Sequence, residues 1–156
     1  MAYTTDIWRP HVVAATVVER GGRFLFVEES IDDRTVINQP AGHLDPGETL
    51  ADAAARETLE ETGWTVRIDH LVGIYLLATE IPGKTFLRFC FAGSALSHDP
   101  TRKLDKEIIQ AHWWTREQAA ARAAQLRSPL VLRAVDDYLA GQRHPLTLLH
   151  DYLKPA

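Results

Sequence analysis

Three glutamates on one predicted helix are the residues of this sequence whose spacing best suits chemistry. Glu57 and Glu61 are one helical turn apart, and Glu60 lies about 60° to the other side of Glu57, so the three carboxylates share one face. Like charges at this spacing weaken a helix, whereas a hard divalent cation turns their repulsion into attraction. Carboxylate oxygens suit Mg²⁺ or Mn²⁺. The pattern indicates a divalent-metal site, with a solvated acidic face as the alternative.

The helix that carries these acids is expected to run from Leu50 to Thr62. This segment holds good helix formers and no proline or glycine, and Gly63 is suited to end it. The residues roughly opposite the acids are expected to pack, and they are Ala51, Ala55, Leu59 and Thr62. The preceding loop, residues 42–47, and Arg56 beside Glu57 favour a metal site over a solvated face.

The spacing of glycines, acids and arginine around this helix resembles the Nudix box, G-x5-E-x7-R-E-U-x-E-E-x-G-U, in which U is a bulky apolar residue. Its fixed positions are matched by Gly42, Glu48, Arg56, Glu57, Glu60, Glu61 and Gly63. Thr58 departs from the pattern because an aliphatic residue is usual there, while Trp64 fills the last apolar position. The chain is identified as a member of the Nudix hydrolase superfamily.

This resemblance implies a metal site with named ligands. Glu61 is implied as a principal ligand, joined by Glu57 and often Glu60, and the backbone carbonyl of Ala41 adds a further oxygen. Two or three divalent ions, Mg²⁺ with Mn²⁺ as the alternative, would bridge a substrate diphosphate and lower the pKa of the attacking water.

Other box residues are implied to support that site. Arg56 would orient Glu57 by a charge-assisted hydrogen bond, and Glu48 would brace the loop against the helix. Gly42 begins the loop and Gly63 ends the helix.

A carboxylate outside the box often serves this superfamily as an extra ligand or base. Glu107, just before a strand expected at residues 108–114, matches its usual position, and Asp105 is the alternative. A plain loop acid is an equal interpretation of Glu107. If neither acid acts, the base lies within the box at Glu57 or Glu60.

Four further residues are candidates for substrate binding. Arg88 interrupts an apolar run, so it needs an anionic partner such as a substrate phosphate or a buried carboxylate if it faces inward. An outward strand position is the alternative. Asn38 and Gln39 are expected to line a pocket from a strand end, and His43 is placed to touch a phosphate unless it is an ordinary loop residue.

Composition excludes several classes of protein. The 156 residues fit one domain, residues 1–156, and a net charge of −4 with no basic stripe argues against nucleic acid as a partner. The lone Cys90 lies in an apolar run and is expected to be buried and inert. With no apolar run near the length of about 18 residues that a membrane span requires and no signal-like N-terminus, we expect a cytoplasmic monomer or homodimer away from membranes.

The order of elements predicts an α/β fold. Strands are expected at 11–18, 23–27, 35–38, 65–77 (as one strand or two), 85–95 and 108–114. Thr115 with Gln118 forms a capping box for one later helix, and Ser128 with Pro129 begins another that ends before Gly141. Together with the box helix they predict an α/β/α sandwich around a mixed sheet, which the Nudix resemblance also implies.

Shorter runs resemble the NudJ-type phosphatases within that superfamily. They are Asn38 to Leu44, Ala53 to Glu57, Phe86 to Phe89, Leu126 to Val131 and Gly141 to Leu146. The resemblance implies release of orthophosphate from nucleoside di- and triphosphates and from hydroxymethylpyrimidine and thiamin diphosphates. The alternatives are a nucleotide-pool sanitising triphosphatase that releases pyrophosphate, and a non-catalytic Nudix-fold nucleotide sensor.

Overall fold

The computed structural model describes residues 7–154. Its elements in chain order are β1 (His11–Arg20), β2 (Arg23–Ile31), β3 (Arg34–Asn38), β4 (Ala41–His43), α1 (Leu50–Thr62), β5 (Trp64–Ala78), β6 (Thr85–His98), β7 (Ile108–Trp114), α2 (Arg116–Ala120), the 3₁₀ turn η1 (Ala123–Gln125), α3 (Leu130–Leu139) and the 3₁₀ turn η2 (Leu146–Leu148). None of the helices within these residues is long and apolar enough to cross a membrane.

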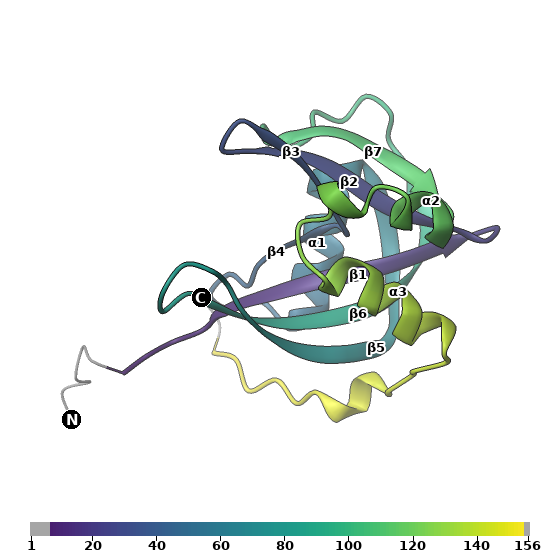
Figure 1. Ribbon diagram of the computed structural model, residues 1–156. Helices are drawn as coiled ribbons and strands as arrows, with labels where there is room; N and C mark the ends of the chain where they lie inside the picture. The colour runs from purple at the N-terminus through teal and green to yellow at the C-terminus, as the bar shows by residue number, and fades with distance from the viewer. Residues whose placement is uncertain (1–6, 155–156) are drawn as a thin grey trace.

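The sheet is mixed, and β1 lies at its centre (Figure 1). Its strands run in the order β3-β2-β1-β6-β5, while β4 pairs with β1 and β7 pairs with β2. The β1–β6 pair is parallel, and the β1–β2, β1–β4 and β5–β6 pairs are antiparallel. The expected mixed sheet is confirmed.

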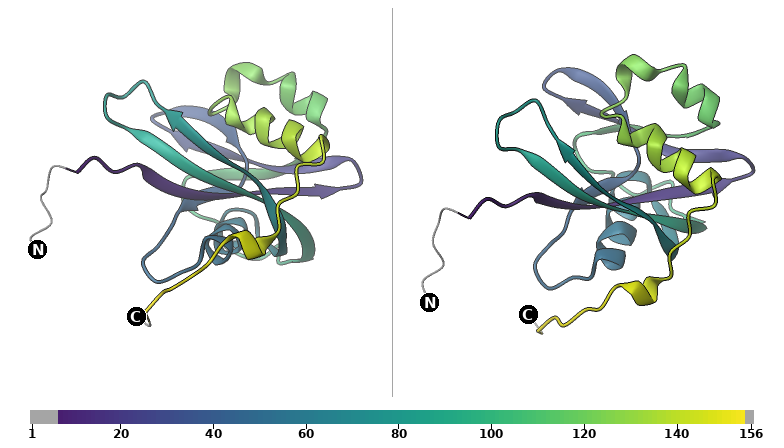
Figure 2. Two further views of the ribbon diagram at one scale, coloured as in Figure 1. Left: turned by 90° about the horizontal axis from the view of Figure 1, so that it is seen from below. Right: turned by 60° about the horizontal axis from the view of Figure 1, so that its bottom comes forward.

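Alternate residues of β1 face two different helical layers. Ala14 packs in one cluster with Ala53 and Ala54 of α1, whereas Ala15 packs in another cluster that includes Val131 of α3. Figure 2 shows α1 on one side of the strands and α2 with α3 on the other. The α/β/α sandwich predicted from the sequence is therefore correct.

β1 and β2 separate soon after their shared turn, and this separation creates space for a site. They are paired only at Glu19 with Phe24 and at Arg20 with Arg23. Further along, β1 pairs with the short strand β4 instead. Val13 of β1, Asn38 of β3 and Gly42 of β4 all line the cleft described below.

The packing face of α1 is only partly the one expected. Thr62 is buried as expected, and Ala51 and Ala55 pack at the edge of core clusters, but Leu59 is only half-buried. The fully buried stripe includes Ala53 and Ala54 and holds Glu61 near its middle. The alanines let the helix approach β1 closely. Glu57 and Glu61 therefore lie on the side of the helix that faces the sheet.

Thr58, the departure from the box, has a structural role on this inner side. Its hydroxyl oxygen lies 2.8 Å from the carbonyl oxygen of Ala54 and 3.0 Å from the hydroxyl of Thr16 on β1, and its single hydrogen can donate to one of them at a time. Thr16 in turn donates to the same Ala54 carbonyl at 3.2 Å. A polar pair replaces the apolar contact that an aliphatic residue would make.

Most predicted element boundaries agree with the structure. α1 spans the residues expected, and the capping box of Thr115 and Gln118 is present. α3 begins at Leu130, one residue later than expected, so Pro129 rather than Ser128 is its N-cap, although Ser128 Oγ still accepts from the N–H of Leu130 at 3.2 Å. Residues 65–77, expected as one strand or two, belong to the single strand β5, whose pairing with β6 shifts register at three points.

Candidate active site

Gly42 on β4 lies directly against the box helix. A Cβ atom built on Gly42 would lie 2.0 Å from the carboxyl carbon of Glu57, which leaves no room for any side chain. This close approach gives a physical reason for glycine at the first position of the box.

Arg56 joins three of the box acids. Its Nη1 donates to Glu57 Oε1 at 2.8 Å and to Glu60 Oε2 at 3.0 Å. Its Nε and Nη2 grip the two oxygens of Glu48 at 3.0 Å and 2.7 Å in a bidentate pair. Each of Glu57 and Glu60 has its second oxygen free of hydrogen bonds from other described residues.

Glu48 also holds the loop that leads into α1. Its Oε1 accepts from the N–H of Asp45 at 2.8 Å, while Arg56 Nη2 reaches the carbonyl oxygen of His43 at 3.0 Å. These contacts, led by the hydrogen bonds from Arg56, lower the pKa of Glu48. The loop and the helix are thus tied together by one carboxylate and one guanidinium.

Glu61 is the most deeply buried acid of the box, with 6% of its surface exposed. Its Oε2 accepts from the N–H of Ala41 at 3.0 Å. Burial, followed by the charge of nearby Glu29, raises the pKa of Glu61 to about 9. A divalent cation beside this carboxylate would favour its charged form. Ala41, whose carbonyl the resemblance implied as a ligand, is therefore next to Glu61.

A group of three carboxylates could hold a metal ion. Glu57, Glu60 and Asp105 each offer an oxygen within 4.8 Å of the others. Burial also raises the pKa of Glu57 despite its bond to Arg56. Carboxylates this close repel one another when all are charged, and a bound hard divalent cation would offset that repulsion.

Asp105, the alternative to Glu107, is the acid of this loop that lies with Glu57 and Glu60. The N–H of Asp105 donates to the carbonyl oxygen of Glu60 at 3.1 Å, which holds this loop against the end of α1. Ile108 then closes a turn on Asp105, and the side chain of Glu107, 54% exposed, lies 3.7 Å from Lys106. The geometry favours Asp105 over Glu107, because Glu107 is not part of the group of acids, and the role of either residue stays a prediction.

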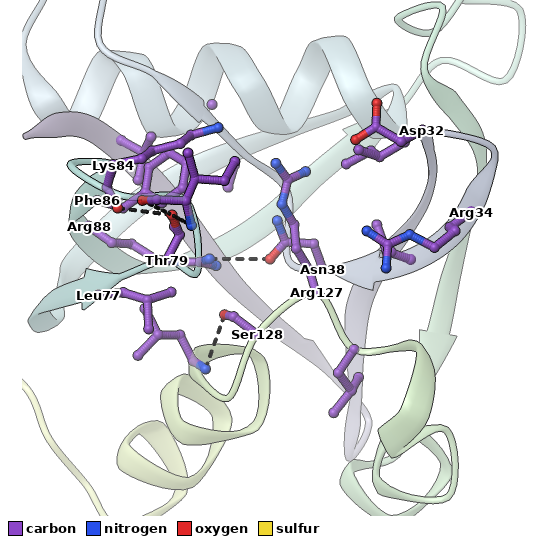
Figure 3. A pocket seen from close by; sticks show the side chains of 18 of the residues that line it. Asp32, Arg34, Asn38, Leu77, Thr79, Lys84, Phe86, Arg88, Arg127 and Ser128 are labelled. Carbon is purple, nitrogen blue, oxygen red and sulfur yellow. Dashed lines mark hydrogen bonds between the residues drawn. The ribbon is translucent and has the colours of Figure 1, made fainter.

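A cleft of about 540 Å³ is shown in Figure 3. Ala41 and Gly42 of the box loop are among its lining residues. Its walls come from β3, β4, the β5–β6 hairpin and the segment before α3. Apolar side chains such as Leu77, Phe86 and Leu126 line part of it. The cationic side chains that line it are Arg34, Lys84, Arg88 and Arg127, against one acid, Asp32. The cleft suits an anionic group attached to a less polar body.

Arg88 faces inward, so the outward alternative is wrong. It is 6% exposed, and its Nη1 donates to Asn38 Oδ1 at 3.2 Å (Figure 3). Its Nη2 donates to Gln39 Oε1 at 2.7 Å. Gln39 is 1% exposed and does not line the cleft, contrary to expectation; it lies behind Arg88 and donates to the carbonyl oxygen of Val131 at 2.5 Å.

His43 lines the cleft beside the box loop. Its Nε2 lies 3.3 Å from Nδ1 of His11, and its ring faces Phe86 at 6.3 Å between centroids. Burial and the neighbouring His11 lower its pKa, so the imidazole is neutral near pH 7.

Sequence reasoning missed two charged residues near the acids. Glu29 on β2 is 6% exposed and accepts from Arg127 Nη1 at 2.9 Å. The alternation of β2 would have turned one of the adjacent pair Glu28 and Glu29 inward, which is a signal that was available. Arg127 lay within a run already singled out for its resemblance.

A model of the NUDIX domain matches residues 8–134. The chain therefore belongs to the NUDIX domain family, and it is a hydrolase that acts on phosphoanhydrides. The fold and the acidic helix described above are those of this class.

Particular relatives narrow the comparison. The proteins called Phosphatase NudJ from Shigella boydii serotype 4 (strain Sb227) and from Escherichia coli (strain K12) are each 42% identical to it over 150 residues, 96% of this chain and 96% of theirs. The solved NUDIX hydrolase from Nitrosomonas europaea is 43% identical, with a TM-score of 0.90 over 92% of this chain and 98% of that one.

Proposed function

We propose that this chain hydrolyses nucleoside di- and triphosphates, together with hydroxymethylpyrimidine diphosphate and thiamin diphosphate, and releases orthophosphate. The observation that carries the proposal is the 42% identity to proteins called Phosphatase NudJ, which extends over 96% of both chains. The substrates are those that resemblance to NudJ-type enzymes implies. The cleft supports the proposal because it combines a cationic region with apolar walls.

Mg²⁺ is the proposed cofactor, with Mn²⁺ as a substitute. Glu57, Glu60 and Asp105 would hold it, together with Glu61 and the carbonyl oxygen of Ala41. The bound metal would supply charge that neutralises a diphosphate and acidifies the attacking water. Asp105, rather than Glu107, is the proposed extra carboxylate outside the box.

The chain's own residues would orient the reacting groups. Arg56 holds one oxygen of Glu57 and one of Glu60, so the second oxygen of each would remain available to a metal ion or to a proton from water. The candidates for a general base are therefore Glu57, Glu60 and Asp105. Neutral His43 can donate one hydrogen bond to a phosphate oxygen, while Arg88, fixed by Asn38 and by Gln39 behind it, supplies a positive charge.

The product formed from GTP tests this function. In ¹⁸O-water with Mg²⁺, ³¹P detection should show GDP and labelled orthophosphate first, followed by hydrolysis of GDP. Hydroxymethylpyrimidine diphosphate should yield its monophosphate. Early pyrophosphate with GDP left intact would instead favour the pool-sanitising triphosphatase. Binding of GTP without hydrolysis of any of these compounds would favour the non-catalytic sensor.

A further inference from the structure

Arg88 is a buried cation whose bonded partners are neutral. Its hydrogen-bond acceptors are the amide oxygens of Asn38 and Gln39, at 3.2 Å and 2.7 Å. Its Nε is buried and has no partner among the described residues. Arginine remains protonated in proteins, so the guanidinium keeps its full charge although burial lowers its pKa.

The groups around Arg88 do not neutralise it. Burial raises the pKa of Cys90 to about 11 and also raises that of Tyr75, so both stay uncharged near pH 7. Glu29 is the acid that acts on Arg88 at longer range, and it is already paired with Arg127 at 2.9 Å. Burial also raises the pKa of Glu29, which further weakens it as a counter-charge. A buried charge without a counter-charge is costly, and an entering anion would offset that cost.

The cation opens into the cleft rather than into the sealed core. Arg88 and Asn38 both line the cleft, together with Arg127 and Lys84 (Figure 3). Lys84 Nζ lies 5.4 Å from the centre of the Phe86 ring and makes no ion pair within residues 7–154. An anion beside Arg88 would therefore find further positive charge along the same wall.

The guanidinium is also held in a fixed orientation. Gln39 accepts from Arg88 through its oxygen and donates to the carbonyl of Val131 through its nitrogen, so the first turn of α3 anchors the amide that anchors the arginine. Two planar amides on a planar guanidinium leave little freedom. A preorganised cation of this kind binds an oxyanion at low entropic cost.

We infer that Arg88, held by Asn38 and Gln39, forms a phosphate subsite that binds a phosphate oxyanion without any metal ion. The subsite deepens the proposed function and rests on it for its role in turnover, where it would take a substrate phosphate or the orthophosphate product. Its attraction comes from side-chain charge, whereas the acids of the box can bind phosphate only through a metal. Metal-free orthophosphate binding is therefore its signature.

Calorimetric titration with inorganic phosphate in EDTA, at constant ionic strength, tests the subsite. The wild-type protein should show saturable binding at one site. Arg88→Met removes the charge while keeping the volume roughly similar, and Asn38→Asp puts a carboxylate where Arg88 Nη1 donates. Each should weaken phosphate binding by about tenfold or more, since a charge-assisted contact is lost or internally satisfied. Arg122→Met is the matched control, because Arg122 stacks on Trp114 and does not line the cleft.

Three results would overturn the subsite: no saturable phosphate binding by the wild type in EDTA, undiminished binding in a folded Arg88→Met or Asn38→Asp variant, or an equal loss in Arg122→Met. Urea unfolding verifies that each variant is folded, and if Arg88→Met does not fold, Asn38→Asp decides. Hydrolysis of GTP by the wild type with Mg²⁺ is measured separately. If the wild type hydrolyses GTP but does not bind phosphate in EDTA, the subsite is refuted and the proposed function is not. If it binds phosphate in EDTA but does not hydrolyse GTP, the proposed function is refuted and the subsite is not.

Discussion

Gly42→Ala should damage the site through a single methyl group. The Cβ added at Gly42 would lie 2.0 Å from the carboxyl carbon of Glu57 and 2.1 Å from its Oε1. Gly42 does not have a positive φ, so alanine is compatible with the backbone and the effect comes from the contact alone. Glu57 must then retreat by more than about 1 Å, a shift of the size that costs catalysis up to about 100-fold.

That retreat also strains the contacts that hold the carboxylate. Arg56 Nη1 donates to Glu57 Oε1 at 2.8 Å and to Glu60 at 3.0 Å, so moving one acid disturbs the other. Overpacking of this kind costs about 1–3 kcal/mol in the free energy of unfolding. We expect kcat for phosphate release from GTP to fall by about 100-fold at saturating Mg²⁺, with a folded protein of reduced stability.

Gly141→Ala separates this contact from general effects of adding a methyl group. Gly141 has φ +82, and a Cβ there would meet nothing within 4 Å, so alanine strains the backbone without touching the site. It should lower stability by about 1 kcal/mol and leave kcat unchanged. If Gly42→Ala, measured beside this control, kept the wild-type kcat, catalysis would not depend on the position that Glu57 takes against Gly42.

Three further predictions concern the acids. Glu61→Gln should stay folded and lose orders of magnitude in kcat at saturating Mg²⁺, because the amide keeps the shape and loses the ligand charge; near-normal turnover would exclude Glu61 as a principal ligand. Asp105→Asn should lower kcat strongly with little change in KM, whereas Glu107→Gln should behave like the wild type, and the opposite pattern in steady-state kinetics would restore Glu107. In EDTA, the folded protein should keep a proton on Glu61, with its pKa of about 9, that the unfolded chain releases near the ordinary value of 4.5. Tm should therefore fall as pH rises between these values, and a parallel decline in Glu61→Gln would contradict the assignment of that proton.

Local patterns in the sequence were sufficient to predict the layers of the fold. Helix α1 was bounded correctly because Gly63 and the absence of helix breakers before it are local signals. The central strand β1 was recognised from its β-branched run. The side of α1 that faces inward was predicted only in part: Thr62 is buried as expected, but the buried side also includes Glu57 and Glu61. The close packing of Ala53 and Ala54 on β1 is a tertiary fact that periodicity does not contain.

In the site, too, some residues could be placed from local spacing and others could not. Glu57, Glu60 and Glu61 share a helix, so their spacing brings them together whatever the rest of the chain does. Asp105 comes from a loop whose position depends on its hydrogen bond to the carbonyl of Glu60. Two candidate acids separated by one residue in such a loop cannot be distinguished by spacing, since a single turn decides which one points to the helix.

Arg88 shows what a charge in an apolar strand can and cannot reveal. Its position in an apolar strand predicted that Arg88 would need a hydrogen-bonding or anionic partner if it faced inward. Arg88 is buried, so the condition is met. The partners are two amides from the end of β3, which lie fifty residues away in the chain at Asn38 and forty-nine at Gln39. Amides satisfy the hydrogen bonds of a guanidinium without cancelling its charge, whereas a carboxylate would do both. Because its bonded partners are neutral, Arg88 adds its positive charge to those of Arg127 and Lys84 in the same cleft.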